Sequence, residues 1–323
     1  DHGRCILCGR CVRICGEIEA NHTLDFAKRG WKTVVSADLA HSLGGSSCTQ
    51  CGACLQACPT GAIFSKLSLY KAKPKDCQQV NTTCPICGVG CELTVLTKDN
   101  NLVMIEAPQI TGEKGPLCRM GRFGLLADGH KRITSPMIRD KEGKLKECTL
   151  DEALEAAGSR MKKLGKNFTG VVSSRLPSET LSLFCRFMKQ AVGSTRVDTM
   201  GGDAFRVISE GIKAFSKKGE GFEIECSMDE ILKADCILLV GADPVKTHPI
   251  VASFIRRAVD RNQAQLIVLD AANDVLPIWR DVWLKPRAGS EGTLLSGLAN
   301  IILTKGLTRI KEPSVKLVQS LSE

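Results

Sequence analysis

Aromatic side chains are scarce in this sequence: they make up 4% of the 323 residues, with three tryptophans and a single tyrosine. Proteins that bind single-stranded nucleic acid stack successive bases on aromatic rings, and this composition supplies few such rings. The formal net charge of +9 is a modest excess of basic residues for a chain of this length. We therefore expect no nucleic acid among the partners of this chain.

Long hydrophobic runs are also missing. No apolar stretch approaches the roughly 18 to 20 residues that a helix needs to cross a bilayer, and the strongly apolar stretches are as short as Cys236 to Val240. We expect no membrane insertion by this chain. Hydrophobic residues make up 43% and charged residues 24% of the sequence, which excludes collagen and a disordered chain. A G-x-G-x-x-G dinucleotide-binding sequence is absent as well, so nothing in the sequence binds flavin or NAD itself.

Cysteine, by contrast, is abundant. Twelve of the seventeen cysteines fall in three groups, and most neighbours within a group are two or three residues apart. Neighbours this close suit a shared metal centre better than disulfides to one another. We therefore expect a reduced metal-binding electron carrier, located in the cytoplasm. Four cysteines outside the groups are expected to pack as small hydrophobic residues: Cys148, Cys185, Cys226 and Cys236.

The first two groups share the pattern C-x2-C-x2-C-x3-C, and Pro59 follows the second. Bacterial two-cluster ferredoxins hold two cubane 4Fe-4S clusters with this pattern, and the fourth cysteine of each run binds the other cluster. The alternative is a pair of zinc knuckles, although zinc sites are commonly built from two separated C-x2-C hooks. The predicted ligands are Cys5, Cys8, Cys11 and Cys58 for the first cluster, and Cys48, Cys51, Cys54 and Cys15 for the second.

A third group consists of Cys84, Cys87 and Cys91 on a glycine-rich turn, with Cys118 following 27 residues later. Three neighbouring thiolates and a distant fourth can bind a further 4Fe-4S cluster, and the glycines allow the tight turn round it. On spacing alone, a zinc site is the alternative.

Composition divides the chain after the last of these cysteines. We expect an α+β, ferredoxin-like two-cluster domain over residues 1–75 and a small β-rich 4Fe-4S module over residues 77–136. An α/β domain with a parallel, Rossmann-like sheet should follow over residues 149–306, and residues 307–323 form a tail. Within the β-rich module, Glu92 to Leu96 and Leu102 to Ile105 are predicted to be paired strands, with Asp99 to Asn101 as their turn.

In the third part, the hydrophobic period becomes helical. Thr149 and Glu152 have the spacing of a capping box, which predicts a helix that ends near Gly165. The order of strand, helix and strand that follows predicts a parallel sheet. The expected strands are 170–173, 236–241 and 265–270, and the expected helices are 178–192, 248–261 and 291–303.

The third cysteine group carries a family resemblance. The sequence C-P-x-C-G-V-G-C with the later C-x-x-G-R-F-G resembles the N-terminal 4Fe-4S module of the molybdopterin oxidoreductase family, above all that of cytoplasmic formate dehydrogenase catalytic chains. The similarity continues through residues 238–249, 266–270 and 283–292. The first cysteine run resembles ferredoxin domains fused inside formate dehydrogenases, iron-only hydrogenases and the large iron-sulfur subunit of respiratory complex I. In the molybdopterin family, the strand ending at Gly241 helps to bind one guanine dinucleotide pterin.

The sequence departs from the formate-oxidising members at two positions. The resemblance implies a cysteine or selenocysteine followed by a histidine soon after Val197-Asp198, but residues 199–206 contain neither and offer only Asp203 as an oxygen ligand. The family's lysine between cluster and pterin is replaced by Met120, whose thioether lacks the N–H groups of an ammonium. If Glu323 is the natural end, the segment that encloses the second pterin is also missing. We expect no catalytic residues and no molybdopterin guanine dinucleotide.

The predicted function is therefore that of an electron-transfer subunit with three 4Fe-4S clusters and a catalytically empty molybdopterin-like domain. The resemblance implies a hetero-oligomer in which a flavin- and NAD-binding redox subunit and another redox subunit are the partners. The alternative is a catalytic-chain fragment of a molybdenum or tungsten bis-pterin formate dehydrogenase. Because the chain begins at Asp1, close to its first cysteine, we expect further residues upstream.

Overall fold

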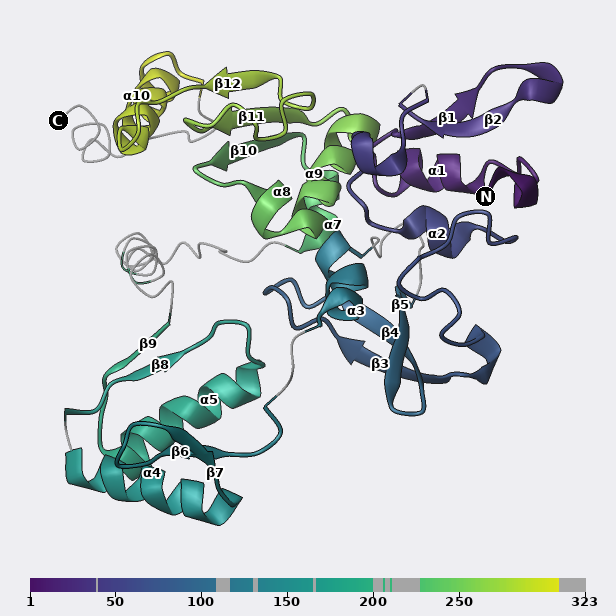
Figure 1. Cartoon of the computed structure of the whole chain (residues 1–323). Helices are drawn as coiled ribbons and strands as arrows, with labels where there is room; N and C mark the ends of the chain where they lie inside the picture. The colour runs from purple at the N-terminus through teal and green to yellow at the C-terminus, as the bar shows by residue number, and fades with distance from the viewer. Residues whose placement is uncertain are drawn as a thin grey trace. The chain divides into compact units, whose positions relative to one another are not determined.

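The computed structural model describes residues 1–38, 40–108, 117–129, 133–164, 167–199, 206, 210 and 227–307 (Figure 1). The backbone forms two compact units. The first comprises Asp1–Thr83, Cys91–Leu126 and Cys226–Glu323, and the second comprises Cys84–Gly90 and Ala127–Glu225.

The first cysteine runs lie in an α+β part of the first unit. Helices α1 (Arg10–Glu17) and α2 (Ala53–Ala57) pack against each other, and β1 (Leu24–Ala27) pairs antiparallel with β2 (Val34–Ala37). The sequence analysis did not predict this hairpin, because the strands are only four residues long. Short 3-10 turns occur at His2–Arg4, Gly30–Lys32, Leu43–Gly45 and Pro74–Asp76.

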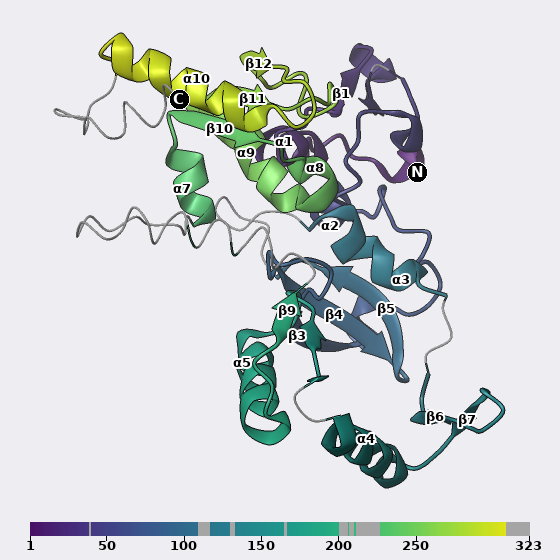
Figure 2. The ribbon, with the colours of Figure 1, turned by 90° about the vertical axis from the view of Figure 1, so that its left-hand side faces the viewer.

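A three-stranded antiparallel sheet follows in the same unit (Figure 2). The predicted strand pair is confirmed as β4 (Glu92–Lys98) and β5 (Asn101–Glu106). Asp99 and Asn100 connect the strands with φ angles of 49° and 59°, the left-handed pair that a tight hairpin needs. Strand β3 (Gln78–Thr83) was not predicted, because its six residues are all exposed and show no apolar alternation. A π-helical turn, Met120–Gly124, follows the sheet in this unit, and α3 (Leu125–Ala127) comes next, at the boundary with the second unit.

The first unit ends in a parallel sheet of order β10, β11, β12, in agreement with the predicted parallel strands. Its core consists of Ile255, Leu266, Val268, Val275 and Leu276, and α7 packs against α9 beside it. The strands are β10 (Cys236–Val240), β11 (Gln265–Leu269) and β12 (Val282–Leu284); the helices are α7 (Met228–Lys233), α8 (Pro244–Thr247), α9 (Pro249–Asn262) and α10 (Glu291–Thr304).

Over the residues that the structure describes, the named elements of the second unit are two small sheets and two longer helices. The antiparallel pair is β6 (Met137–Arg139) with β7 (Leu145–Glu147), and the parallel pair is β8 (Gly170–Val172) with β9 (Val197–Thr199). The helices are α4 (Leu150–Leu164) and α5 (Ser178–Arg186), which continues as a π-helical stretch over Phe187–Val192. The strands predicted between residues 149 and 306 thus belong to two separate sheets.

The predicted capping box at the start of α4 is confirmed. The Thr149 N–H donates to Glu152 Oε2 at 2.8 Å, and the Glu152 N–H donates to Thr149 Oγ1 at 3.3 Å. These two bonds satisfy N–H groups that a helix start leaves without intrahelical acceptors.

The expectation of buried cysteines outside the groups is wrong for two of them. Cys236 is exposed because it begins β10, an edge strand, and Cys185 is exposed on α5. Cys148 is half-buried, and Cys226 lies outside the described residues. Among the described residues, none of the helices combines the length and apolar composition needed to span a membrane.

Candidate iron-sulfur sites

The first unit contains a cavity of about 540 Å³ that is lined by cysteines of both runs. Cys5, Cys8 and Cys11 reach it from the first run, and Cys58 reaches it from the end of the second. This is the set that the doubled pattern predicts for the first cluster. Four thiols round one space are the donor set of a cubane cluster, so the residues present fit the group.

The cavity also favours the deprotonated state of one thiol. Burial raises the pKa of Cys58, but hydrogen bonds from Ile63, Thr60 and Ala62 together bring the pKa below its ordinary value. Thr60 adds its side chain, with Oγ1 3.8 Å from the sulfur. Because the thiolate is the form that binds iron, these contacts prepare Cys58 as a ligand.

The other four cysteines of the two runs lie near one another and are deeper in the protein. Burial, together with the neighbouring Cys48 and Cys15, raises the pKa of Cys54 to about 12. Burial also raises the pKa of Cys51, with Cys54 and Cys15 among the charges that add to the effect. The four thiols therefore resist ionisation while they are near one another without a metal. Iron binding would have to displace their protons.

Both runs fold their loops in the same way. In each run, the residue before the second cysteine has a left-handed φ: 54° at Leu7 and 57° at Gln50. The glycine after the second cysteine also has one: 71° at Gly9 and 70° at Gly52. The two left-handed positions curl the loop toward its own cysteines, and the glycines then begin α1 and α2. The repeated sequence pattern is thus a repeated backbone structure.

Backbone N–H groups also donate to the sulfurs of predicted ligands. The Gln50 N–H donates to Cys48 Sγ, and the Gly121 N–H donates to Cys118 Sγ, each at 3.3 Å. Hydrogen bonds to ligand sulfurs are one of the means by which proteins set the potential of iron-sulfur clusters.

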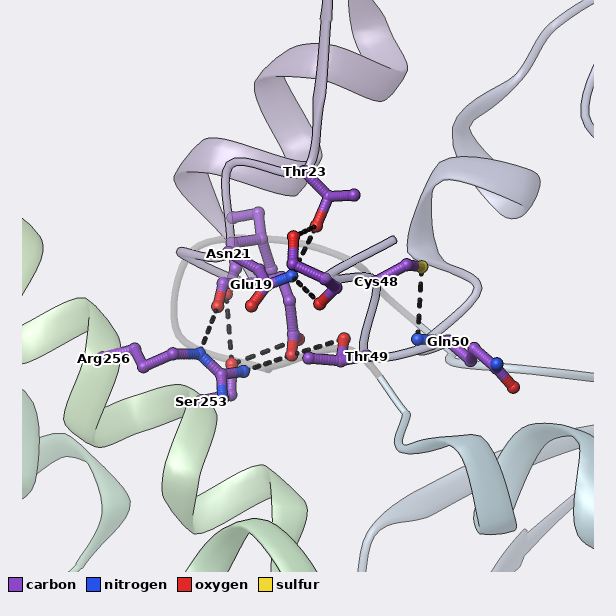
Figure 3. Close-up of polar contacts among 10 residues, drawn as sticks. Glu19, Asn21, Thr23, Cys48, Thr49, Gln50, Ser253 and Arg256 are labelled. Carbon is purple, nitrogen blue, oxygen red and sulfur yellow. Dashed lines mark hydrogen bonds and ion pairs between the residues drawn. The ribbon is translucent and has the colours of Figure 1, made fainter. Parts of the chain in front are cut away.

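A buried ion pair lies next to Thr49, in the loop of the second cysteine run (Figure 3). Glu19 and Arg256 form a salt bridge with side chains that are 5% and 4% exposed, and Arg256 Nε also donates to the Glu19 carbonyl at 3.2 Å. The Thr49 hydroxyl, one residue after Cys48, donates to Glu19 Oε1 at 3.0 Å. Ser253 donates to Glu19 Oε2 at 3.3 Å. Helix α9 is thereby connected to the loop that carries Cys48.

Burial raises the pKa of Glu19, and the donors Arg256, Thr49 and Ser253 oppose that rise. The sequence analysis did not single out Glu19 or Arg256. Each is an ordinary charged residue in its local sequence, and only the fold brings them together.

A second arginine, Arg122, holds the same loop from another element. Its side chain is 1% exposed, and its Nε donates to the carbonyl of Cys51 at 2.8 Å. Its Nη1 donates to the Ile105 carbonyl at 3.2 Å, and its Nη2 donates to Gln56 Oε1 at 3.0 Å. The C-x-x-G-R-F-G motif contained this residue, but the motif alone gave no sign that the guanidinium reaches the second cysteine run.

The third cysteine group is divided between the two units: Cys84 and Cys87 belong to the second, and Cys91 and Cys118 to the first. Cys84 is buried and the other three are half-buried. That the four share a cluster stays a prediction. In the described part of the chain, no three cysteine, histidine or acidic side chains lie close enough to share a single metal ion. The cluster assignments therefore depend on the shared cavity, the proximity of the thiols and the spacing.

Comparison with protein families follows the same division of the chain. Residues 132–311, more than half of the sequence, match the molybdopterin oxidoreductase profile. The chain belongs to the molybdopterin oxidoreductase family. Residues 77–126 match the Fe4S4 domain of that family, and residues 4–62 match a 4Fe-4S dicluster domain. The resemblance expected from the cysteine motifs is confirmed. The fold is mixed α/β with a ferredoxin-like 4Fe-4S module.

Three relatives show the range of this family. A subunit of NADH-quinone oxidoreductase from Rhizobium meliloti is 31% identical over 91% of this chain and 34% of its own length. NADPH-Fe(3+) oxidoreductase subunit alpha of Geobacter sulfurreducens is 25% identical over 95% of this chain and 36% of its own. A protein named "Putative formate dehydrogenase" in Staphylococcus haemolyticus is 26% identical over 95% of this chain and 35% of its own length. The chain spans about a third of the length of these relatives.

Among solved structures, acetylene hydratase from Pelobacter acetylenicus aligns with a TM-score of 0.58 and 20% sequence identity, over 75% of this chain and 35% of that one. At this identity the likeness extends to the fold alone.

Proposed function

We propose that this chain is an electron-transfer subunit that holds three 4Fe-4S clusters within a larger oxidoreductase. The observation that carries the proposal is the cavity of about 540 Å³ where Cys58 joins Cys5, Cys8 and Cys11. A set drawn from both runs is what a two-cluster ferredoxin needs and what two independent zinc knuckles would not produce.

The second cluster belongs to Cys48, Cys51, Cys54 and Cys15, the other set that the doubled pattern predicts, and these thiols lie close enough to affect one another's pKa. The third belongs to Cys84, Cys87, Cys91 and Cys118, on the match of residues 77–126 to a family Fe4S4 domain. When bound, each cluster can accept and release one electron. The protein itself supplies thiolates and N–H donors to their sulfurs.

Residues 149–306 are proposed to form a Rossmann-like molybdopterin-type domain without a pterin. Met120, at the position of the family's lysine, is 50% exposed and offers no N–H group. The stretch where a catalytic cysteine would lie, residues 200–205, falls outside the described residues. We place no catalytic residue in this chain.

Two relatives are named as subunits of an NADH-quinone and an NADPH-Fe(3+) oxidoreductase. A hetero-oligomer is therefore the proposed state, with a flavin- and NAD-binding subunit as one partner and another redox subunit as the second. We place the assembly in the cytoplasm, where cysteines remain reduced.

Metal analysis of the anaerobically purified chain tests the proposal. We expect about 12 iron atoms per chain, from three cubanes of four irons each, and no stoichiometric zinc, molybdenum or tungsten. Zinc in place of iron would contradict the electron-transfer function.

The name of one relative supports an alternative function. In this alternative, the chain is a catalytic-chain fragment of a molybdenum or tungsten formate dehydrogenase. Asp203 would then have to bind the metal through oxygen. Stoichiometric molybdenum or tungsten together with pterin would favour this alternative.

A further inference from the structure

The loop of the second cysteine run is hydrogen-bonded to a buried cation that lies outside the ferredoxin part. Arg122 comes four residues after Cys118, and its N–H donates to the Cys118 carbonyl at 3.0 Å. Its guanidinium meets the Cys51 carbonyl at 2.8 Å. A single residue therefore joins the backbone at a predicted ligand of the third cluster to the backbone at a predicted ligand of the second.

The contact is held in place by the surrounding structure. Gln56 on α2 accepts from Arg122 Nη2 at 3.0 Å and also forms two hydrogen bonds with the backbone of Ala107, at 2.7 Å and 3.1 Å. Ile105 on β5 accepts from Nη1. The guanidinium thus lies between α2 and the end of the three-stranded sheet, with all three of its nitrogens bonded. A planar side chain with donors in fixed directions suits such a position, and lysine would not reproduce it.

The three acceptors are two backbone carbonyls and one amide oxygen, so none of these hydrogen bonds is made to a charged group. Glu19, the buried carboxyl near the same loop, is instead paired with Arg256. Burial lowers the pKa of Arg122, and the thiols of Cys51 and Cys54, with Glu106, oppose that change. Because its Nε lies 2.8 Å from the Cys51 carbonyl and its side chain is buried, the charge of Arg122 lies close to the second cysteine set in surroundings that screen it little.

On this basis, and resting on the proposed function, we propose that Arg122 is a positioning residue for the second cluster. It fixes the loop of Cys48 to Cys54 against the Cys118 segment, and its charge raises the reduction potential of that cluster. Reduction adds a negative charge to an already anionic group, and a nearby buried cation favours the reduced state.

The test is a redox titration of the reconstituted chain, monitored by electron paramagnetic resonance, with three variants. Arg122→Met removes the charge and the hydrogen bonds. Arg122→Lys keeps the charge but loses the fork of donors. Arg119→Met removes an exposed cation three residues earlier on the same segment and serves as the matched control.

We expect Arg122→Met to shift the second cluster to a lower potential, while Arg122→Lys stays near the native value and Arg119→Met does not move it. The cluster of Cys5, Cys8, Cys11 and Cys58 should shift less and serves as an internal reference. Native potential in Arg122→Met, or an equal fall in the methionine and lysine variants, would overturn the electrostatic part of the proposal.

If Arg122→Met does not retain the second cluster, the test depends on Arg122→Lys alone. A lowered reduction potential of the second cluster in this variant, which keeps the charge, would contradict the inference. The positioning part has its own readout in the apo chain. Limited proteolysis should cut the loop between Cys48 and Cys54 faster in both Arg122 variants than in Arg119→Met, and equal rates would argue against it. Native protein without iron would instead refute the proposed function and leave the contacts of Arg122 unexplained.

Discussion

Gly52 and Arg122 are so close that a methyl group could not be placed between them. A Cβ added to Gly52 would lie 2.3 Å from Arg122 Cδ and 2.8 Å from its Nε, and Gly52 has a φ of +70° that side chains rarely adopt. The glycine of the second cysteine run is thus required both by the backbone conformation and by the arginine packed against it.

Gly52→Ala should therefore destabilise the apo chain by about 2 to 5 kcal/mol, the sum of left-handed strain and overpacking. Urea unfolding followed by circular dichroism measures this loss. Gly30→Ala is the matched control, because Gly30 has a similar φ of +60° but no heavy atom within 4 Å of the added Cβ. It should lose only the strain, about 1 kcal/mol. Equal losses would show that Arg122 can move aside.

The crossing of the fourth cysteines predicts a selective loss of clusters. Cys58→Ala should remove a ligand from the cavity of Cys5, Cys8 and Cys11 and leave the deeper cluster largely intact. Cys15→Ala should have the opposite effect. Iron content and the paramagnetic signals of the two clusters give the measurement. Loss of the deeper cluster in Cys58→Ala would show that the fourth cysteine of a run binds the cluster of its own run and not that of the other.

The buried pair of Glu19 and Arg256 should matter more than an exposed pair on the same helix. Arg256→Met leaves the Glu19 carboxyl buried without its guanidinium, and we expect a loss of about 3 to 5 kcal/mol in the free energy of unfolding. Arg261→Met is the control, since Arg261 meets Glu17 at 3.8 Å with both side chains about half exposed, and should cost about 1 kcal/mol or less. Similar losses would mean that the buried pair contributes no more than a surface pair.

Joint replacement of Glu19 and Arg256 by methionine should recover part of the loss seen in Arg256→Met. An apolar pair leaves no uncompensated charge, although Thr49 and Ser253 then lose their acceptor. A double variant less stable than the single one would contradict this account.

The capping box of α4 gives a prediction for the second unit. Thr149→Ala removes the acceptor of the Glu152 N–H and should lower stability by about 1 kcal/mol. Ser290→Ala at the start of α10 is the control, because the Ser290 side chain forms no capping bond there. Thermal unfolding by circular dichroism compares the two variants. A larger effect at Ser290 would be inconsistent with the capping role of Thr149.

Local patterns predicted the elements whose causes are local. The turn at Asp99 and Asn100 and the helix that starts after Thr149 each follow from a few neighbouring residues. Strand β3 could not be found in this way, because its pairing with β4 is made by backbone hydrogen bonds while its side chains remain exposed. A pattern of apolar residues carries no information about such an edge strand.

The cysteine spacing predicted the thiols that line the cavity, but not the residues that support the loops. Arg122 and Gln56 are 66 positions apart, and they meet only because α2 lies against the end of β5. Exposed Cys185 and Cys236 show the converse error, since residue type alone predicted burial and the position on each element decided otherwise.

Glu19 and Arg256 are 237 positions apart in the sequence, so their salt bridge can form only late in the synthesis of the chain. A ribosome adds roughly 5 to 20 residues per second, so roughly 10 to 50 seconds pass between the synthesis of the two residues. For most of that interval, the loop of Cys48 and Thr49 exists without helix α9, and the carboxyl of Glu19 cannot pair with Arg256. The segment that carries the first two cysteine runs therefore reaches its final structure only after a helix made much later has folded against it.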